Sequence, residues 1–286
     1  MDSIWINAPA KINIGLDVIR RREDGYHEVK MIMQSIRLFD RLTLTKTKEP
    51  GIKLTTNLSY LPVNEDNLVY QSAKRLMDEF HLEGGLDIKL DKRIPAAGMA
   101  GGSTDAASCM LAINDLYGLG LSKRHLMKRG VKLGADIPYC ILKGTALSEG
   151  IGEKLSTIPA MPSCYILIAK PNIHVSTKWV YTNLVLDEHT NHPDIDGMLA
   201  SMKKRDLLSL SNQIGNVLES VTIPAYPQIA AIKECMLQNG ALGSLMSGSG
   251  PTVFGIFDDK DKAMAAKEKC RELPYRCFVF VTDLYR

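Results

Sequence analysis

Long apolar runs are absent from this sequence of 286 residues. No stretch approaches the roughly 18 apolar residues that a membrane-spanning helix requires, and the longest candidates, "YILIA" and "CFVFV", are typical of buried strands. The first residues, "MDSIWINAPAK", lack the basic start and the apolar stretch of a signal peptide. We therefore expect no membrane segment and a cytoplasmic protein.

Cysteine is scarce and scattered, with six residues at positions 109, 140, 164, 235, 270 and 277. They form no CxxC motif and no Cys/His group with zinc spacing, which favours a reduced, intracellular chain. Histidine is also rare, and the pair in "HTNH", residues 189–192, lies in a polar, proline-flanked stretch without a third ligand nearby. We interpret this stretch as a solvated loop rather than a metal site.

A strong excess of either charge is also missing, because the formal net charge is only +3. The basic run "MKKR", residues 202–205, is short and typical of a solvated surface. We therefore expect no nucleic-acid partner. With 45% hydrophobic residues, the chain is long enough to bury the core of one or two domains.

Strand and helix patterns are mixed in both halves of the sequence. In the first half they predict strands at 41–47, 52–56 and 86–90, and helices at 67–80, 103–117 and 121–134, with Asn67 and Ser122 as caps. In the second half we expect strands at 165–171 and 276–283, a strand–loop–strand unit at 243–257, and helices at 176–185, 206–219, 226–239 and 261–273. Hairpin-like pairs favour an α+β fold. The prolines of "IPAMPSC" mark a junction near residue 160, so we expect domains at residues 1–158 and 159–286.

The segment "RIPAAGMAGGSTDAAS", residues 93–108, places Gly98, Gly101 and Gly102 in front of a helix that we expect to start near Ser103. Bare backbone amides and a helix N-terminus together make a site for an anion, most often a phosphate. The glycine spacing fits neither a Walker A loop nor a dinucleotide-binding loop. A tight turn with Ser103 as the helix cap explains the same residues, and both interpretations stay open on local grounds.

Four other segments attract attention. Lys11 lies on an apolar, strand-like stretch and needs a partner or a function there. Tyr26 follows a turn and could stack on a flat ring, although a hairpin edge also explains it. Asp136 precedes Pro138, and local grounds favour a helix cap there over a catalytic acid. The second glycine-rich loop, "MSGSGP" at residues 246–251, has more glycine than a hairpin needs and leaves room for a ligand's close approach.

Three of these segments, "PAKINIGLDV", "PAAGMAGGSTDAAS" and "GSLMSGSGPTVFGIF", resemble in their order the three signature motifs of the GHMP small-molecule kinases. Within that superfamily "AKIN", "DGYHEV" and "GADIPYC" are most similar to the subfamily that acts on a cytidine diphosphate-linked methylerythritol. The resemblance spans nearly the whole chain, from Pro9 to Phe257. It implies the two-domain GHMP kinase fold, with an N-terminal domain like the second domain of ribosomal protein S5 and a ferredoxin-like C-terminal domain.

The resemblance also implies a reaction and its residues. ATP would donate its γ-phosphoryl group, with Mg²⁺ as cofactor, to the 2-hydroxyl of the methylerythritol in the non-mevalonate isoprenoid pathway. Lys11 and Asp136 match the catalytic pair of the family, and Asn13, Tyr26 and His27 match substrate-binding positions. The ATP-binding residues would be Pro95, Ala96, Ala97, Gly98, Met99, Ala100, Gly101, Gly102, Ser103, Thr104 and Asp105. Thr104 stands where the subfamily often has a second serine, so a hydroxyl is kept.

Other functions stay open at this point. The same chemistry on mevalonate or homoserine is one, and "DGYH" argues against it. A nucleotide-binding module without catalysis is another, and the presence of both Lys11 and Asp136 argues against it. A structural or interaction protein would leave both glycine-rich loops unexplained. The sequence indicates neither the oligomeric state nor the Mg²⁺ ligands.

Overall fold

The computed structural model describes residues 2–95 and 97–286. The chain divides into two compact units, and neither unit is one continuous stretch. Unit 1 contains Met1–Ala10, Leu38–Ala96 and Ala100–Lys143, and unit 2 contains Lys11–Arg37, Ala97–Met99 and Gly144–Arg286. Two long strands, β1 (Ser3–Arg21) and β2 (His27–Thr47), contribute residues to both units.

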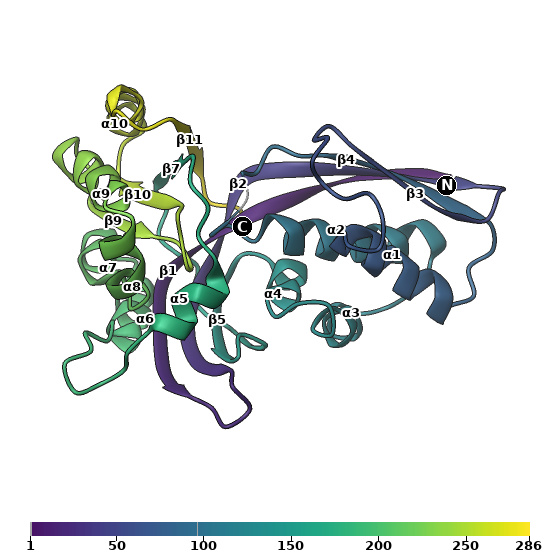
Figure 1. The fold of residues 1–286 in the computed structure, drawn as a ribbon, viewed down its shortest axis with the longest axis horizontal. Coiled ribbons are helices and arrows are strands. Elements are labelled where there is room, and N and C mark those ends of the chain that lie inside the picture. The colour runs from purple at the N-terminus through teal and green to yellow at the C-terminus, as the bar shows by residue number, and fades with distance from the viewer. Residues whose placement is uncertain (1, 96) are drawn as a thin grey trace. The chain divides into compact units, whose positions relative to one another are not determined.

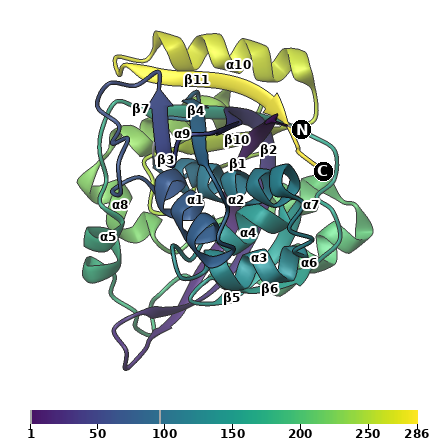
Figure 2. The same cartoon turned by 90° about the vertical axis from the view of Figure 1, so that its right-hand side faces the viewer.

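A sheet covered by helices forms unit 1. In it β4 (Gly85–Asp91) pairs antiparallel with the end of β2 and parallel with β3 (Gly51–Thr56), in the register Arg41 opposite Asp91 and Gly51 opposite Gly85. The predicted alternation places Leu42 and Leu44 in the core. Four helices cover one face of this sheet (Figures 1 and 2): α1 (Leu68–Glu79), α2 (Gly101–Tyr117), α3 (Lys123–Gly130) and α4 (Ile137–Leu142).

The helix α2 lies against both α1 and α4. Its fully buried Ala106, Ala107 and Ala112 present little side chain, so neighbouring helices can approach closely. This explains a helix that is apolar on most sides and has no single hydrophobic stripe.

Unit 2 contains a second, antiparallel sheet. Its strand order is β11–β7–β10–β9, formed by Cys277–Asp283, Tyr165–Pro171, Val253–Phe257 and Gly243–Met246. Every residue of the inner strand β10 is buried, as its uninterrupted apolar run predicts. The helices α9 (Gln228–Gln238) and α10 (Lys260–Glu272) pack against this sheet.

The rest of unit 2 is built on the last part of β1 and the first part of β2. There β5 (Thr145–Gly150) pairs with Val29–Gln34 of β2 and with β6 (Lys154–Thr157), and β8 (Gly215–Asn216) pairs with Gly15 and Leu16 of β1. The remaining helices are α5 (Thr177–Asn183), α6 (Ile195–Lys204), α7 (Leu207–Gln213) and α8 (Glu219–Ala225).

Most of the predicted elements and the α+β class are confirmed. The Asn67 side chain accepts a hydrogen bond of 2.9 Å from the Val69 amide, and the Ser122 side chain accepts one of 3.3 Å from the His125 amide, so both predicted caps are present. Every helix in the described part of the chain is too short or too polar to span a bilayer.

Three predictions of helix boundaries are wrong. The helix after the first glycine-rich loop starts at Gly101, not Ser103, because Ala100 takes the cap position with a φ of 55°. The helix predicted at 121–134 ends at Gly130, and the one predicted at 206–219 is two helices separated by β8. The sequence interpretation also missed α6 altogether.

Candidate active site

The middle of the first glycine-rich loop belongs to unit 2, where the second loop holds its carbonyl oxygens. Ser247 Oγ donates to the carbonyl oxygen of Gly98 at 2.7 Å, and Thr252 Oγ1 donates to that of Ala97 at 2.8 Å. The carbonyl of Met99 accepts from the Lys11 amide at 3.2 Å. In a trans peptide the carbonyl and the next N–H point in opposite directions. The first two bonds therefore turn the following amides away from the second loop, and the third turns the next amide away from β1, as an anion cradle requires.

Glycine is required where the two loops touch. Gly98 has a φ of 81°, and a Cβ there would lie 2.7 Å from the carbonyl oxygen of Ser247. Gly248 has a φ of 60°, which favours glycine, and a Cβ there would make only an ordinary contact of 3.6 Å with the Cα of Gly98. Glycine at position 98 thus lets the two backbones approach each other, and glycine at position 248 supplies a positive φ in the second loop.

Polar side chains of β1 meet the same loop. Lys11 Nζ donates to Asn13 Oδ1 at 2.6 Å, and both residues are buried. The Asn13 amide donates to Ser247 Oγ at 3.2 Å, so this hydroxyl links β1 to the first glycine-rich loop. Asn216 Nδ2 donates to the carbonyl oxygens of Met246 and Gly248, each at 2.8 Å. The sequence interpretation missed Ser247, Thr252 and Asn216, although the hydroxyls in "MSGSGPT" signalled the first two.

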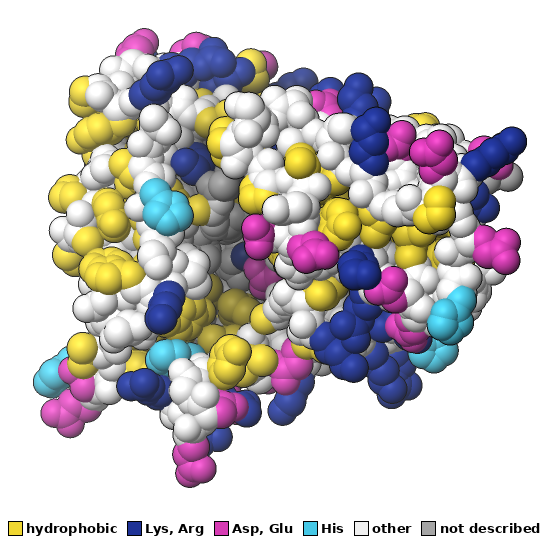
Figure 3. All heavy atoms as spheres, turned by 45° about the vertical axis from the view of Figure 1, so that its right-hand side comes forward, with side chains coloured by type: hydrophobic (Ala, Val, Ile, Leu, Met, Phe, Trp, Pro, Cys, Tyr) yellow, Lys and Arg dark blue, Asp and Glu magenta, His cyan; other side chains and the backbone are white. Residues whose placement is uncertain are grey.

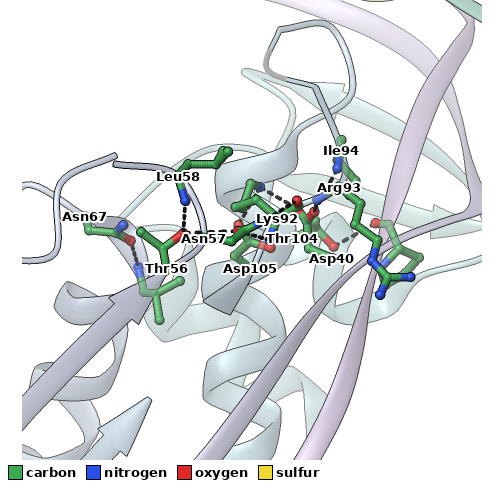
Figure 4. A network of polar contacts seen from close by, with 12 residues as sticks. Asp40, Thr56, Asn57, Leu58, Asn67, Lys92, Arg93, Ile94, Thr104 and Asp105 are labelled. Carbon is green, nitrogen blue, oxygen red and sulfur yellow. Dashed lines mark hydrogen bonds and ion pairs between the residues drawn. The ribbon is translucent and has the colours of Figure 1, made fainter. Parts of the chain in front are cut away.

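The two flanks of the first loop belong to unit 1 and are held by buried charges (Figure 4). Asp40 Oδ1 accepts hydrogen bonds from the amides of Arg93 and Ile94 at 2.5 and 2.8 Å. Lys92 Nζ forms ion pairs with Asp40 and with Asp105, the latter at 2.7 Å. The side chains of Lys92, Asp40 and Asp105 are only 9%, 0% and 3% exposed.

Burial dominates the electrostatics of this cluster. It raises the pKa of Asp105 well above the usual range, although the ammonium of Lys92 works in the opposite direction. Burial also opposes the charged form of Lys92, but the two carboxylates outweigh it and raise the pKa of this lysine. Neither Asp40 nor Lys92 was among the residues singled out in the sequence.

The two hydroxyls predicted to bind ATP, those of Ser103 and Thr104, have different surroundings at the start of α2. Thr104 Oγ1 donates to the carbonyl oxygen of Pro9 at 2.7 Å and is buried, so its proton is already used within the protein. Ser103 is half-buried and Gly102 is exposed in the first turn, while Pro95 is half-buried. The predicted site residue Ala96 lies outside the described residues.

Asp136 occupies the cap position of α4, with Pro138 in the first turn, but its side chain makes no capping hydrogen bond. The local explanation of this acid as a side-chain cap therefore does not hold. Asp136 lies in unit 1 and Lys11 in unit 2, and their pairing stays a prediction.

The predicted substrate-binding residues Tyr26 and His27 lie where β1 turns into β2. Tyr26 is 61% exposed, which suits stacking on a ligand. The ring of His27 lies 5.1 Å from that of Tyr181, and burial, together with the charge of Arg21, lowers its pKa. At neutral pH His27 is therefore a neutral imidazole with one donor and one acceptor nitrogen.

The interpretation of "HTNH" as a solvated loop is confirmed, because His189 and His192 are exposed outside any helix or strand, and one contact is added to it. His192 Nδ1 lies 2.7 Å from Oδ1 of Asp17, a buried residue of β1, so this histidine is anchored to the sheet. Across the described residues no group of three or more His, Cys, Asp and Glu side chains could hold a metal ion.

A groove of about 920 Å³ on unit 1 is lined by charged side chains that form ion pairs at the surface, in contrast to the buried cluster. It lies between α1 and the segment around α3, and Lys74 and Arg129 on its wall pair with Asp78 and Glu79. On the face drawn in Figure 3, several basic side chains gather in one dark-blue patch, with a few acidic side chains beside it. None of the predicted site residues lines this groove.

Comparisons with known proteins agree with the motifs. Family models match two segments: GHMP kinases N terminal domain at residues 67–144 and GHMP kinases C terminal at residues 198–276. The chain is 50% identical to a 4-diphosphocytidyl-2-C-methyl-D-erythritol kinase of Lachnospira eligens, over 100% of this chain and 99% of the relative. It is 53% identical to the protein of the same name of Lachnoclostridium phytofermentans, over 100% of this chain and 98% of that one.

Solved structures show the same relationship. A crystal structure of 4-(cytidine 5'-diphospho)-2C-methyl-D-erythritol kinase aligns with a TM-score of 0.84 and 31% identity, over 98% of this chain and 99% of that chain. A homoserine kinase from Cytophaga hutchinsonii aligns with a TM-score of 0.83 and 21% identity, over 99% and 95% of the two chains. The second alignment shows a shared fold only.

Proposed function

Because the chain belongs to the GHMP kinase family, and within it to the 4-diphosphocytidyl-2-C-methyl-D-erythritol kinases, we propose that it phosphorylates 4-diphosphocytidyl-2-C-methyl-D-erythritol. The γ-phosphoryl group of ATP passes to the 2-hydroxyl, giving the 2-phosphate and ADP in the non-mevalonate isoprenoid pathway. The enzyme is an ATP-dependent phosphotransferase, and the expected GHMP kinase fold is confirmed. The domain boundary at 158/159 and the cytoplasmic location stay predictions.

One observation supports this proposal most directly: the carbonyl oxygens of Ala97, Gly98 and Met99 are all engaged within the protein. The amides that follow them point the other way, and the N-terminus of α2 comes next. Within residues 95–105 we propose that backbone amides and the hydroxyl of Ser103 bind the triphosphate. Thr104 and Asp105 support the site through their buried contacts, because their side chains already have partners.

We assign the proton transfer to Asp136. The 2-hydroxyl oxygen bonds to the γ-phosphorus, the bond from that phosphorus to the bridging oxygen of ADP breaks, and the hydroxyl proton passes to the Asp136 carboxylate. Asn13 Oδ1 holds the ammonium of Lys11, which would offset negative charge on the attacking oxygen. Because this alcohol is tertiary and weakly acidic, much of the catalysis comes from positioning and charge stabilisation.

The cytidine end of the substrate would meet the turn between β1 and β2. The exposed ring of Tyr26 offers a stacking surface, and the neutral imidazole of His27 offers hydrogen bonds to the edge of the base. Mevalonate and homoserine have no base, so this turn favours the cytidyl substrate over both.

Mg²⁺ usually binds nucleotide enzymes through phosphates, waters and one or two protein oxygens. In this chain the hydroxyl of Ser103, half-buried in the first turn of α2, would be the protein oxygen available to a Mg²⁺ ion that came with the nucleotide. When bound, such an ion would supply charge neutralisation on the β- and γ-phosphates.

A kinase assay tests the proposal. The purified chain is incubated with ATP and, separately, the cytidyl substrate, mevalonate and homoserine, and ADP release and the position of the new phosphate are measured. We expect turnover with the cytidyl substrate alone. Turnover with mevalonate or homoserine instead would identify a different kinase, and nucleotide binding without turnover would identify a binding module.

Asp136→Asn is the matched variant for the mechanism. It should lower kcat by about 10²–10⁴-fold, the usual contribution of a general base, while the affinity for both substrates stays within a few-fold. A near-normal kcat would remove Asp136 from the proposed role. Lys74→Gln, on the exposed face of α1, is the control and should keep full activity.

A further inference from the structure

We propose that Asp40, Lys92 and Asp105 form a positioning network that holds the two flanks of the glycine-rich loop in the geometry that binds nucleotide. The network acts through the backbone and through α2. This inference rests on the proposed function, because it assumes that the loop binds the phosphates of ATP.

The N-terminal flank is fixed by Asp40. One carboxylate oxygen accepts the amides of two consecutive residues, Arg93 and Ile94, so this stretch cannot shift along β2 without losing both bonds. The next residue, Pro95, has no N–H and a restricted φ. The direction in which the chain enters the loop is therefore set by a side chain 53 positions away from Arg93.

The C-terminal flank is fixed through Lys92. Its ammonium reaches Asp105, which lies in α2 one turn after Gly101, and so connects the start of this helix to β2. The backbone of Lys92 is itself held, because its amide donates to Asn57 Oδ1 at 2.8 Å and its carbonyl accepts from Asn57 Nδ2 at 3.0 Å. A single lysine thus links both flanks of the loop.

Gly101 belongs to this arrangement as well. A Cβ built on Gly101 would lie 3.2 Å from Lys92 Nζ and 3.5 Å from Ile94 Cγ2. Gly102, the next residue, meets only Leu68 Cδ1 at 3.7 Å. The two glycines therefore differ: a side chain at Gly101 would press on the ammonium, whereas Gly102 leaves room for one.

The cluster places one ammonium between two carboxyl groups, so both depend on the same positive charge. Oδ1 of Asp105 is buried and has no hydrogen-bond partner within the described residues. Removing the ammonium would disfavour the charged form of Asp105 further and would break the ion pairs that connect α2 to the N-terminal flank. A network of this kind transmits a change at any member to both ends of the loop.

The test compares nucleotide affinity with stability in single and double variants. ADP is titrated calorimetrically into each protein, KM for ATP and for the cytidyl substrate is measured, and urea unfolding reports the folded state. Lys92→Met should raise the Kd for ADP and KM for ATP by about 10-fold or more, the loss of hydrogen bonds to a charged group, and leave KM for the cytidyl substrate within about twofold.

The double variant Lys92→Met/Asp105→Asn separates positioning from direct contact. Asp105→Asn supplies an N–H group that can donate to Asp40 in place of the lost ammonium, so most of the lost ADP affinity should return. If Lys92 contacted the nucleotide directly, a change at Asp105 could not restore that contact. The double variant would then bind ADP as weakly as Lys92→Met.

Asp40→Asn keeps the inference testable if Lys92→Met does not fold. Its amide group would face the ammonium of Lys92, and we expect the Kd for ADP to rise by about 10-fold. The control Lys74→Met breaks an exposed pair of 2.9 Å and should change neither affinity nor kinetics.

Each result decides between the proposals. Folded network variants with lowered stability but unchanged ADP affinity would reduce the network to a structural role and overturn the inference. A wild-type chain that binds ADP but phosphorylates none of the alcohols would overturn the proposed reaction alone, and one that binds no ADP would overturn both.

Discussion

The middle of the glycine-rich loop and its flanks are held by different chemistry. Within unit 2 the carbonyls of Ala97 and Gly98 accept hydrogen bonds from the neutral hydroxyls of Thr252 and Ser247. Within unit 1 the flanks are held by ions that are almost fully buried. A neutral hydrogen bond can be lost at modest cost, whereas a buried charge that loses its partner is strongly destabilising. Substitutions that break the contacts of the flanks should therefore lower the free energy of unfolding more than substitutions that break the contacts of the middle.

The largest effect should come from Asp40→Ala. This change leaves the amides of Arg93 and Ile94 without their acceptor and removes one of the two counterions of Lys92. We expect the free energy of unfolding to fall by about 3–5 kcal/mol, measured by urea denaturation without nucleotide. A loss below about 1 kcal/mol would mean that the buried ions of the flanks stabilise the protein no more than the neutral hydrogen bonds of the middle.

Gly98→Ala should come second. The φ of 81° is strained for alanine, and its Cβ would lie 2.7 Å from a carbonyl oxygen of the second loop. We expect a loss of about 1–3 kcal/mol in unfolding free energy together with weaker ADP binding in calorimetry. The matched control is Gly118→Ala, because Gly118 also has a positive φ, of 63°, but nothing lies within 4 Å of its Cβ position. An equal loss of ADP affinity in both variants would show that the contact between the two glycine-rich loops does not affect nucleotide binding.

Ser247→Ala should have a smaller effect. It removes a donor to the Gly98 carbonyl and an acceptor for the Asn13 amide. We expect unfolding free energy to fall by about 1 kcal/mol and the Kd for ADP to rise a few-fold, measured by denaturation and calorimetry. A loss as large as that of Asp40→Ala would contradict the expected difference between the middle and the flanks.

The smallest effect should come from Lys74→Gln, which breaks an exposed ion pair on α1. Water and salt already screen such pairs, so thermal denaturation in low and in high salt should show no measurable change from the unmodified chain. A clear destabilisation at low salt would mean that burial is not what separates the two kinds of ion pair.

The sequence predicts what local patterns encode. Period-two alternation located the strands at 41–47 and 86–90, and side-chain caps located the starts of α1 and α3. The position of the first glycine-rich loop was clear because no regular element needs so much bare backbone. The α6 helix was also predictable, since Ile195, Met198 and Met202 follow a helical spacing after the capping Asp194, but its polar surroundings obscured it.

Long-range partners were beyond local reasoning. Nothing in "LFDRL" marks Asp40 as a buried acceptor for a segment more than 50 residues later, and Lys92 looks like any solvated lysine at the end of a strand. The start of α2 was misplaced for the same reason, because Ser103 is a good local cap but Ala100 adopts the cap conformation instead. Whether Lys11 and Asp136 act together is likewise a matter of tertiary structure.

The interleaved path of the chain has a practical consequence for anyone who wishes to produce half of this enzyme. A fragment that stops at residue 158 would carry residues 11–37, 97–99 and 144–158 of unit 2 but none of β7, β9, β10 and β11. The hydroxyls of Ser247 and Thr252 would be missing from the nucleotide loop, and apolar strand surface would be exposed to aggregation. A circular permutation that opens the chain in a surface loop keeps every residue, and it is therefore the safer way to study how the two units depend on each other.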